Sequence, residues 1–462
     1  MPHHHVAHLI LGAGPTGLGA AQRLRELGVT DYLILEKGAH PGGLSASFRD
    51  DHGFTWDIGG HVVFSHYEYF DRLLDDLLGR DYLAHQRKAM IRIAGAWVPY
   101  PFQNNIRHLP PDLQWQCIEG LLSLKDTAPT SGTPAHFHDW ILQVFGNGIA
   151  DLFLFPYNFK VWAHPPETMA WNWIGERVSV VDLRRVLKNV VFQQDDVSWG
   201  PNNLFRFPLY GGTGEIFSRL ARRHADHLRL NAKVTRIDAT ARMVTCADGS
   251  AITYDNLLNT APLDWLVLTA LRTGSGPPEP VRAAARNLKH NGVHILGVGL
   301  DGTREDDTCW MYFPEYSNPF YRVTNFHNYS PNNTGRPGEQ RALMAEVSFS
   351  GHKPVDGAAL LHETISGLED VELMRKDDAH RIVSTWEHAE DYGYPIPCLD
   401  RDAALNVIQP WLESLGIYSR GRFGGWKYEV GNMDHSVMQG VEWAERMVLQ
   451  RPEATYSLPR TS

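Results

Sequence analysis

Short apolar runs separated by glycine-rich turns dominate the first 65 residues. Leu9 to Leu11 is a compact apolar run, typical of a strand buried in a parallel sheet. The stretch from Leu18 to Leu27 has helical spacing, and a second apolar run follows at 32–35. This order of strand, helix and strand predicts an α/β fold with a parallel sheet at its centre. Residues 54–58 alternate like a further strand.

The turn after the first run has the pattern G-x-G-x-x-G, formed by Gly12, Gly14 and Gly17. The first glycine permits a tight turn, the second lets the backbone approach a pyrophosphate, and the third lets helix and strand pack closely. Glu36 ends the second run, roughly 20 residues later, where a ribose-binding acid is expected. The pattern predicts a bound dinucleotide. The alternative is a glycine-rich turn between packed elements.

Between residues 65 and 200 the apolar spacing is mostly helical. Apolar side chains recur at intervals of three and four over 69–78 and 113–124, which predicts two amphipathic helices. The composition of 126–136 and of 193–203 predicts polar loops.

Strand signals return after residue 230. Short runs at 233–237 and 243–246 flank a turn, and 257–262 resembles a strand that re-enters a nucleotide-binding sheet. From 293 to 350 short strands dominate, and we expect a closing helix at 436–449.

Composition narrows the class of protein. The chain has 462 residues, 43% hydrophobic and 21% charged, as in globular proteins with a large core. A net charge of −10 argues against nucleic acid or an anionic membrane as the main partner, but not against a small anionic substrate. No apolar run approaches 18 residues, and the N-terminus lacks a signal-peptide pattern.

Cysteine usage favours a reducing compartment. The four cysteines are far apart in sequence, without any C-x-x-C pair. We therefore expect no disulfide, no metal site and a cytoplasmic location. The four are Cys117, Cys246, Cys309 and Cys398.

Seven segments share a chemistry of tyrosine, tryptophan, asparagine and arginine. Aromatic faces stack on bases and sugars, arginines fork onto phosphates, and tyrosine hydroxyls donate without adding charge. Core packing remains the alternative for each aromatic taken alone. The segments are interrupted by proline, glycine and asparagine, which favours a binding surface. They are 97–105, 156–162, 174–177, 310–313, 320–322, 392–395 and 420–436.

The chain resembles the UDP-galactopyranose mutase family, particularly its eukaryotic-type branch. The resemblance extends from GAGPTGLGAA at 12–21 to GNMDHS at 431–436. It is carried by GGHVVFSHYEYFD (59–71), WVPYPFQNN (97–105), PYNFKVWA (156–163), GERV (175–178), GPNN (200–203), GGTG (211–214), YFPE (312–315) and GRFGGWKYEVGN (421–432).

The resemblance implies an α/β fold in three parts. A Rossmann-like FAD-binding domain would be discontinuous, formed by residues 1–64, 200–290 and 415–450. A helical substrate domain, 65–199, would be inserted into it. An antiparallel β-sheet substrate domain would span 291–414.

The cofactor implied is FAD, with no metal. The expected cofactor-binding residues are Gly12, Gly14, Thr16, Gly17, Glu36, Gly43, Leu44, Gly60, His61, Arg422, Gly431, Asn432, Met433 and Ser436. His61 is a candidate for tuning the flavin, with a neutral, backbone-bonded histidine as the alternative. The start of the last helix would stabilise negative charge on the reduced flavin.

The substrate implied is a nucleotide sugar. Arg177 and Arg322 would hold its diphosphate, assisted by Tyr394 and Tyr428. The nucleoside positions are Tyr100, Phe102, Gln103, Asn158 and Trp162, and the sugar region is lined by Asn202, Tyr312 and Asn432. The expected catalytic set is His61, Arg177, Arg322 and Arg422.

The reaction implied is the interconversion of UDP-galactopyranose and UDP-galactofuranose, without net redox change. The N5 atom of reduced FAD would attack the anomeric carbon, and the resulting adduct would open and close as the smaller ring. Only reduced enzyme would be active, with NAD(P)H as the expected reductant.

Four matters stay open from sequence. The substrate is a UDP-sugar or a GDP-sugar such as GDP-galactose. Other readings are an amine-oxidase-type oxidoreductase and a non-catalytic nucleotide-sugar-binding paralogue. The stretch after Pro331 is short compared with fungal members, which leaves monomer and homo-oligomer both open.

Overall fold

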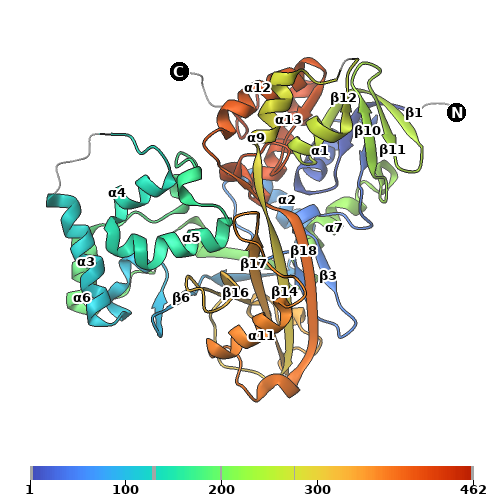
Figure 1. The fold of residues 1–462 in the computed structure, drawn as a ribbon. Coiled ribbons are helices and arrows are strands. Elements are labelled where there is room, and N and C mark those ends of the chain that lie inside the picture. Colours follow the sequence, from blue (N-terminus) through green and yellow to red (C-terminus); the bar gives the residue numbers. More distant parts are fainter. Residues whose placement is uncertain (1–3, 127–131, 198–199, 275, 459–462) are drawn as a thin grey trace.

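The structure is a computed structural model that describes residues 4–126, 132–197, 200–274 and 276–458. Figure 1 shows three parts: a sheet with helices at the top, a helical part to one side, and a second sheet below. Strand β1 (His4–Leu11) and helix α13 (Met433–Leu449) both lie in the upper part, so the chain leaves that part and later returns to it. Portions of the expected loops at 126–136 and 193–203 lie outside the described residues.

The expected helices at 18–27, 69–78, 113–124 and 436–449 are confirmed. The first begins earlier than expected, at Pro15, because proline suits the first helical turn. The helices are α1 (Pro15–Glu26), α2 (Glu68–Leu78), α3 (Pro111–Asp126), α4 (Phe137–Ile149), α5 (Phe155–Trp162), α6 (Leu183–Phe192), α7 (Gly214–Arg222), α8 (Leu263–Trp265), α9 (Glu279–Asn287), α10 (Phe326–Tyr329), α11 (Leu360–Asp370), α12 (Arg401–Ser414) and α13 (Met433–Leu449).

The upper sheet has eight strands in the order β13-β10-β11-β12-β1-β2-β9, and β19 also pairs with β12. Its centre is parallel, as the apolar runs predict, because β1 runs parallel to both β2 and β12. The strands are β1 (His4–Leu11), β2 (Tyr32–Leu35), β9 (Leu228–Arg229), β10 (Val234–Asp238), β11 (Met243–Cys246), β12 (Ala251–Asn259), β13 (Leu271–Arg272) and β19 (Ile417–Ser419).

The carboxyl ends of the central strands meet at one edge, where Leu11 is aligned with both Leu35 and Asn259. Gly12 follows at once, with φ of 102°, and donates its N–H to the Leu35 carbonyl at 2.8 Å. A Cβ at Gly12 would lie 2.2 Å from Thr260 Oγ1, so only glycine fits there. Ligands of open parallel sheets bind at this edge.

Helices α1 and α13 cross in direct backbone contact. A Cβ at Gly440 would lie 2.0 Å from the Thr16 carbonyl oxygen, and one at Gly19 would lie 2.6 Å from that of Val437. No side chain caps the N-terminus of either helix. Each end therefore presents free N–H groups and a partial positive charge.

The helical part has its own apolar core between α3, α4, α5 and α6. Phe102, Ile141 and Phe145 are fully buried there, and Phe102 stacks on Phe153 with ring centroids 4.6 Å apart. The core continues to Trp162 at the end of α5, so this part supports one wall of the region where the three parts meet.

The lower sheet has seven strands in the order β18-β14-β17-β16-β15-β6-β7. All neighbours are antiparallel except β15 and β6, which run parallel. The strands are β6 (Ala89–Ile93), β7 (Ala96–Pro99), β14 (Lys289–Asp301), β15 (Trp310–Tyr312), β16 (Arg322–Asn325), β17 (Gln340–Phe349) and β18 (Ile382–Ile396).

The mostly helical prediction for 65–200 is wrong for residues 82–99, which form strands β5 (Tyr82–Gln86), β6 and β7. Burial alternates along β6, and the turn that joins it to β7 is Ala94-Gly95 with φ of 50° and 74°. Positive φ at two central residues is typical of a tight hairpin turn. Two short pairs complete the fold: β3 (Ser47–Arg49) with β4 (Thr55–Asp57), and β5 with β8 (Leu204–Pro208).

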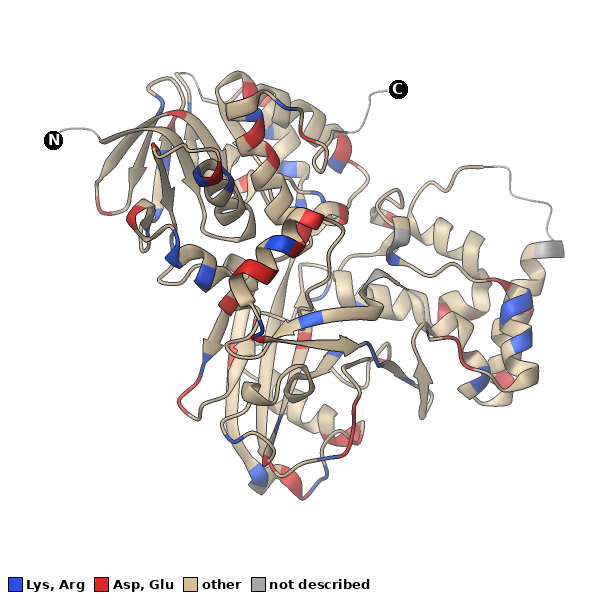
Figure 2. Ribbon diagram, turned by 180° about the vertical axis from the view of Figure 1, so that it is seen from behind, with Lys and Arg blue, Asp and Glu red and all other residues tan. Residues whose placement is uncertain are grey.

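Figure 2 shows acidic and basic residues interspersed along the elements of all three parts. None of the described helices is long and apolar enough to cross a membrane. All four cysteines are free, as their spacing predicts.

The crossing of α1 and α13 gives a test of the fold. We expect Gly440→Ala to lower the free energy of unfolding by about 1–3 kcal/mol, because the new methyl group meets backbone that cannot move aside. Flavin content should fall as well. The matched control is Gly351→Ala, at a position with open space around it. Equal urea midpoints for the two variants would contradict the close crossing.

Candidate active site

The two glycine turns and the acid predicted for the cofactor lie together at the carboxyl edge of the upper sheet. A Cβ at Gly43 would lie 3.4 Å from Gly14 Cα, so the turns face each other. The Glu36 carboxylate accepts hydrogen bonds from the Ala13 and Gly38 N–H groups, both at 2.8 Å. Leu44 follows the second turn and is partly buried against the upper core. The acid thus stabilises the first turn itself.

The segment before α13 reaches the same place. A Cβ at Gly421 would lie 2.5 Å from Thr16 Oγ1, which sets this segment against the first turn of α1. Arg422 then donates to the Gly431 carbonyl at 3.1 Å. Three further predicted cofactor residues lie at the start of α13: Asn432, Met433 and Ser436.

His61 lies at the junction of the upper and lower sheets. Its Nδ1 atom is buried and has no hydrogen-bond partner among the described residues, so the backbone-bonded alternative fails for that nitrogen. Thr324 Oγ1, on β16, is also buried and unpartnered. Burial lowers the pKa of His61 to about 4, and nearby Arg422 and Arg322 act in the same direction against Glu346. His61 is therefore neutral at pH 7.

These features fit a flavin dinucleotide. The facing glycine turns leave backbone accessible to a pyrophosphate, and two uncapped helix ends favour negative charge. Buried polar atoms without partners, His61 Nδ1 and Thr324 Oγ1, mark where a polar ring system would supply hydrogen bonds.

Arginine and tyrosine side chains converge beside this cradle. The Arg177 guanidinium lies over the Tyr428 ring at 4.8 Å, and Arg422 lies over Tyr394 at 4.9 Å and Tyr428 at 5.6 Å. Trp162 meets both tyrosines edge-on, with centroids at 5.7 and 4.8 Å. The structure thus brings together residues predicted from four separate segments.

Two of the three predicted site arginines, Arg177 and Arg422, have no carboxylate partner among the described side chains. Among the described side chains, Arg177 and Arg422 form no ion pair with a carboxylate; they donate to backbone carbonyls, such as that of Glu429. The Glu429 carboxylate is nearby but binds Arg401 at 2.8 and 3.0 Å. A partly buried cation without a counter-ion is costly, so the site is suited to an anion.

Arg322 differs from the other two arginines. Its Nε and Nη2 atoms donate to the Glu346 carboxylate at 2.7 and 2.8 Å, and Glu346 is only 2% exposed. Burial raises the pKa of the Tyr394 and Tyr312 hydroxyls, and Arg322 is close enough to both to oppose part of that rise.

A second aromatic row extends from the arginine cluster. Tyr312 lies 5.3 Å from Tyr157 and 5.7 Å from Tyr100 between ring centroids. Arg87 lies over Tyr100 at 4.8 Å and donates to Asn202 Oδ1 at 2.5 Å. Asn202, predicted from the 200–203 motif, therefore joins the row through Arg87.

Three predicted nucleoside residues make mainly internal contacts. Phe102 is fully buried, so in this conformation it supports the wall and does not form its surface. The Gln103 side chain is buried and its amide N–H donates to the Ser179 carbonyl, whereas its oxygen makes no hydrogen bond to any residue that the structure describes. Asn158 donates to the Leu154 carbonyl at 2.8 Å and accepts from Trp162 at 3.3 Å.

Comparison with solved structures decides the family. A structure of reduced UDP-galactopyranose mutase matches with a TM-score of 0.94 and 42% sequence identity, covering 98% of this chain and 96% of that chain. The chain belongs to the UDP-galactopyranose mutase family. Residues 15–447 also match the wider family of flavin-containing amine oxidoreductases. Membership of both makes the protein a flavoprotein.

Two more distant solved structures share the fold alone. Putrescine oxidase matches with a TM-score of 0.65 at 18% identity, over 97% of this chain and 100% of that chain. Cyclohexylamine oxidase from Brevibacterium oxydans matches with a TM-score of 0.68 at 15% identity, over 96% of this chain and 100% of that chain. A Baeyer-Villiger monooxygenase of Streptomyces coelicolor is 40% identical over 62 residues, which is 13% of this chain and 11% of that protein's length.

Two residues of this mutase-family site escaped the sequence prediction. Arg87 follows a strand that was not predicted, in a segment without glycine or aromatic neighbours. Glu346 is a single acid inside the apolar run 342–349, and an acid buried in a strand was a signal of an unusual role. Tyr157, by contrast, lies in a segment that the aromatic pattern had marked.

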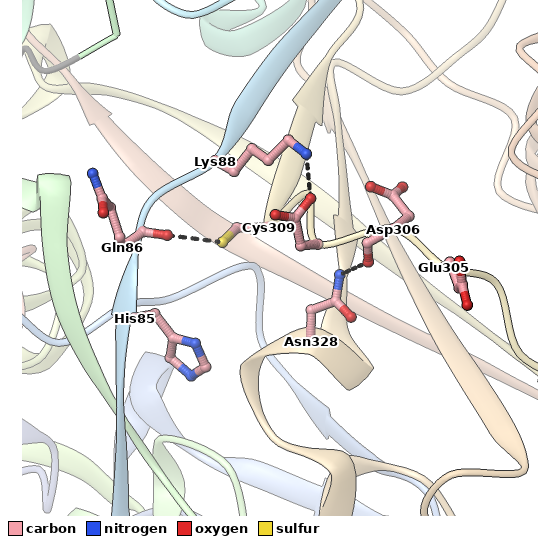
Figure 3. A pocket seen from close by; sticks show the side chains of 8 residues that line it. His85, Gln86, Lys88, Glu305, Asp306, Cys309 and Asn328 are labelled. Carbon is pink, nitrogen blue, oxygen red and sulfur yellow. Dashed lines mark hydrogen bonds and ion pairs between the residues drawn. The ribbon is translucent and has the colours of Figure 1, made fainter.

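A cavity of about 600 Å³ lies elsewhere, beside β5 and β15, and contains none of the predicted site residues. Figure 3 shows its lining side chains bound mainly to one another: Lys88 pairs with Asp307, and Asn328 donates to the Asp306 carbonyl. Several of its polar groups are therefore already paired, and none of them belongs to the arginine and tyrosine cluster.

The neutrality of His61 can be measured by NMR of histidine-labelled protein. We expect the His61 ring signal, assigned by its loss in His61→Gln, to stay constant between pH 8 and 5. Exposed imidazoles in the same spectra are the control, since they titrate near 6.5. The unfolded chain takes up this proton near pH 6.5, so His61 also makes stability fall as pH drops from 6.5 toward 4. A His61 midpoint near 6.5 would contradict the burial argument.

Proposed function

We propose that this protein is an FAD-dependent mutase that interconverts UDP-galactopyranose and UDP-galactofuranose, of the eukaryotic type. The observation that carries the proposal is the pair of arginines, Arg177 and Arg422, which lack acid partners beside the flavin cradle. Their charge suits a substrate diphosphate. The 42% identity to a UDP-galactopyranose mutase supports the sugar and the nucleotide.

In this proposal the arginines act on the leaving group. Breaking the bond between the anomeric carbon and the diphosphate places negative charge on the departing oxygen. Arg177, Arg322 and Arg422 neutralise that charge, and the hydroxyls of Tyr394 and Tyr428 donate to it without adding charge. The same groups keep the diphosphate bound until the rearranged sugar rejoins it.

FAD held by the glycine turns at Gly14 and Gly43 and by the start of α13 would, when reduced, supply an electron pair for the anomeric carbon. The protein orients the sugar toward it and excludes water. Trp162, Tyr157 and Tyr312 form much of the wall around this space, which keeps the activated sugar from hydrolysis. Neutral His61 adds no positive charge of its own, so the α13 terminus remains the nearby stabiliser of the reduced flavin.

The nucleoside is expected along the row formed by Tyr100, Arg87 and Asn202. Arg87 lies over one face of the Tyr100 ring, so a base would stack on the other face, and the Gln103 oxygen would accept from a uracil N–H. A GDP-sugar is the second candidate, because the diphosphate contacts do not distinguish bases.

The remaining proposals concern the location of the protein in the cell, its partners and its reductant. Four separated free cysteines favour the reducing cytoplasm, and the interspersed surface charges favour a small-molecule substrate over nucleic acid. NAD(P)H is the proposed physiological reductant.

The deciding experiment tests redox state and substrate together. Protein reduced once with dithionite, without oxygen, should convert UDP-galactopyranose over many turnovers, and oxidised protein should be inactive. Chromatography of a panel of UDP- and GDP-hexoses identifies the substrate. Activity of fully oxidised protein rejects the mutase mechanism. Oxygen consumption with amines favours the oxidase alternative, and binding without any conversion favours the paralogue.

Arg177→Ala tests the diphosphate assignment. A charge-assisted bond to phosphate is worth roughly 1.5–3 kcal/mol, so kcat/KM should fall about 10- to 100-fold with flavin content unchanged. Arg236→Ala, at an exposed arginine on β10, is the control. Full activity of Arg177→Ala places the diphosphate elsewhere.

Arg322→Ala needs a different design, because it would leave the Glu346 carboxylate buried and unpaired. The double variant Arg322→Ala/Glu346→Gln removes that charge and should show a similar loss of activity.

Competition binding tests whether the site prefers uracil or guanine. UDP should displace a fluorescent nucleotide at lower concentration than GDP, because the chain is 42% identical to a UDP-galactopyranose mutase and the Gln103 oxygen can accept from a uracil N–H. Tighter binding of GDP reverses the assignment.

A further inference from the structure

Glu346 occupies the point where the phosphate-binding and flavin-binding sides of the site meet. It lies on β17 and is 2% exposed. Its carboxylate accepts four hydrogen bonds: two from Arg322 at 2.7 and 2.8 Å, one from the Tyr321 hydroxyl at 2.7 Å, and one from the Gly60 N–H at 2.9 Å. The four bonds come from three groups, which are a guanidinium, a phenol hydroxyl and a backbone N–H, and two of these groups belong to the predicted site residues Arg322 and Gly60.

The Glu346 carboxylate lies close to both glycines of the turn, Gly59 and Gly60. A Cβ at Gly59 would lie 3.4 Å from Glu346 Oε2, and one at Gly60 would lie 3.3 Å from Oε1 and 2.5 Å from Thr324 Oγ1. The backbone of the turn therefore rests directly on the carboxylate. His61, the next residue, is near enough for Glu346 to raise its pKa against the larger effect of burial.

The contact with Arg322 leaves part of the guanidinium available. Glu346 engages the Nε and Nη2 edge, whereas Nη1 makes no hydrogen bond within the described part of the chain. A side-on carboxylate fixes the plane of the guanidinium. The free Nη1 donors are thereby held in a constant direction.

We propose that Glu346 is a positioning residue that couples the two halves of the active site. It fixes Arg322 for the diphosphate and holds the Gly60 turn for the flavin through one carboxylate. The assignment rests on the proposed function. A mutase needs both halves in register, because the sugar must reach the flavin while its diphosphate stays bound.

Two substitutions of Glu346 separate the effect of its negative charge from the effect of its side-chain length. Glu346→Gln keeps the length of the side chain and removes its charge. Glu346→Asp keeps the charge and shortens the side chain by one methylene, so that it cannot reach Arg322 and Gly60 together. Tyr321→Phe is the matched control, because it removes one hydrogen bond and leaves the ion pair with Arg322 intact.

The expected results differ between the variants. Glu346→Gln should lose at least tenfold in kcat while binding UDP as tightly as wild type or more so, since Arg322 gains net charge but loses its orientation. Its flavin midpoint potential should rise, because a nearby negative charge is gone and the anionic reduced flavin is favoured. Glu346→Asp should lose kcat without that rise in potential. Tyr321→Phe should stay within threefold of wild type.

Two outcomes overturn the inference. One is a Glu346→Gln protein with kcat within threefold of wild type and an unchanged potential. The other is a tenfold loss of UDP affinity with an unchanged potential, which is the pattern of a residue that only supports the fold. Failure of the proposed function looks different: wild-type protein then converts no UDP-galactopyranose, and the potentials of the two Glu346 variants still show whether this charge acts on the flavin.

Discussion

The backbone contact between α1 and α13 is the constraint on which the site depends. The two helices come from opposite ends of the chain, and their glycines, Gly19 and Gly440, let them cross without intervening side chains. That crossing brings both uncapped N-termini to the carboxyl edge of the parallel sheet. The positive end of α1 then acts beside the glycine turn that would hold the pyrophosphate, and the positive end of α13 acts beside the place proposed for the flavin ring.

The charges of the site follow a division of labour. Arg322 is neutralised by a buried carboxylate, so its position is fixed and its net charge in the empty site is small. Arg177 and Arg422 lie over tyrosine rings, which stabilise a cation without cancelling its charge. An incoming dianion therefore meets two cations with full charge and a third with fixed geometry. Arg177 and Arg422 therefore attract the dianion, and Arg322 orients it.

The fold was predictable wherever a local steric rule acts. Gly12 must have positive φ and must avoid Thr260, and this kind of requirement is visible in the sequence as a glycine motif. Long amphipathic helices such as α2 were predictable from spacing. The β6–β7 hairpin was not, because its strands are short and its partners lie about 200 residues away. Sequence spacing carries no information about such distant pairing.

Site residues, too, were predictable only where a local sequence feature marked them. Tyr394, Tyr428 and Arg177 were found because they stand in distinctive motifs, and the structure brings them together. Glu346 and Arg87 were missed because each is one polar residue in an ordinary strand context. Phe102 shows the converse: a residue inside a distinctive motif lies behind the surface, because motifs mark segments and cannot assign individual side chains to a face.

The parallel pairing of β6 with β15 has a consequence for biosynthesis. Ala89 pairs with Trp310, which leaves the ribosome roughly 220 residues later. At about 5–20 residues per second, residues 89–99 wait about 10 to 40 seconds for the strand that completes their hydrogen bonds. During that interval the edge of β6 lacks its partner strand, and an unpaired strand edge is the kind of surface on which chains associate wrongly.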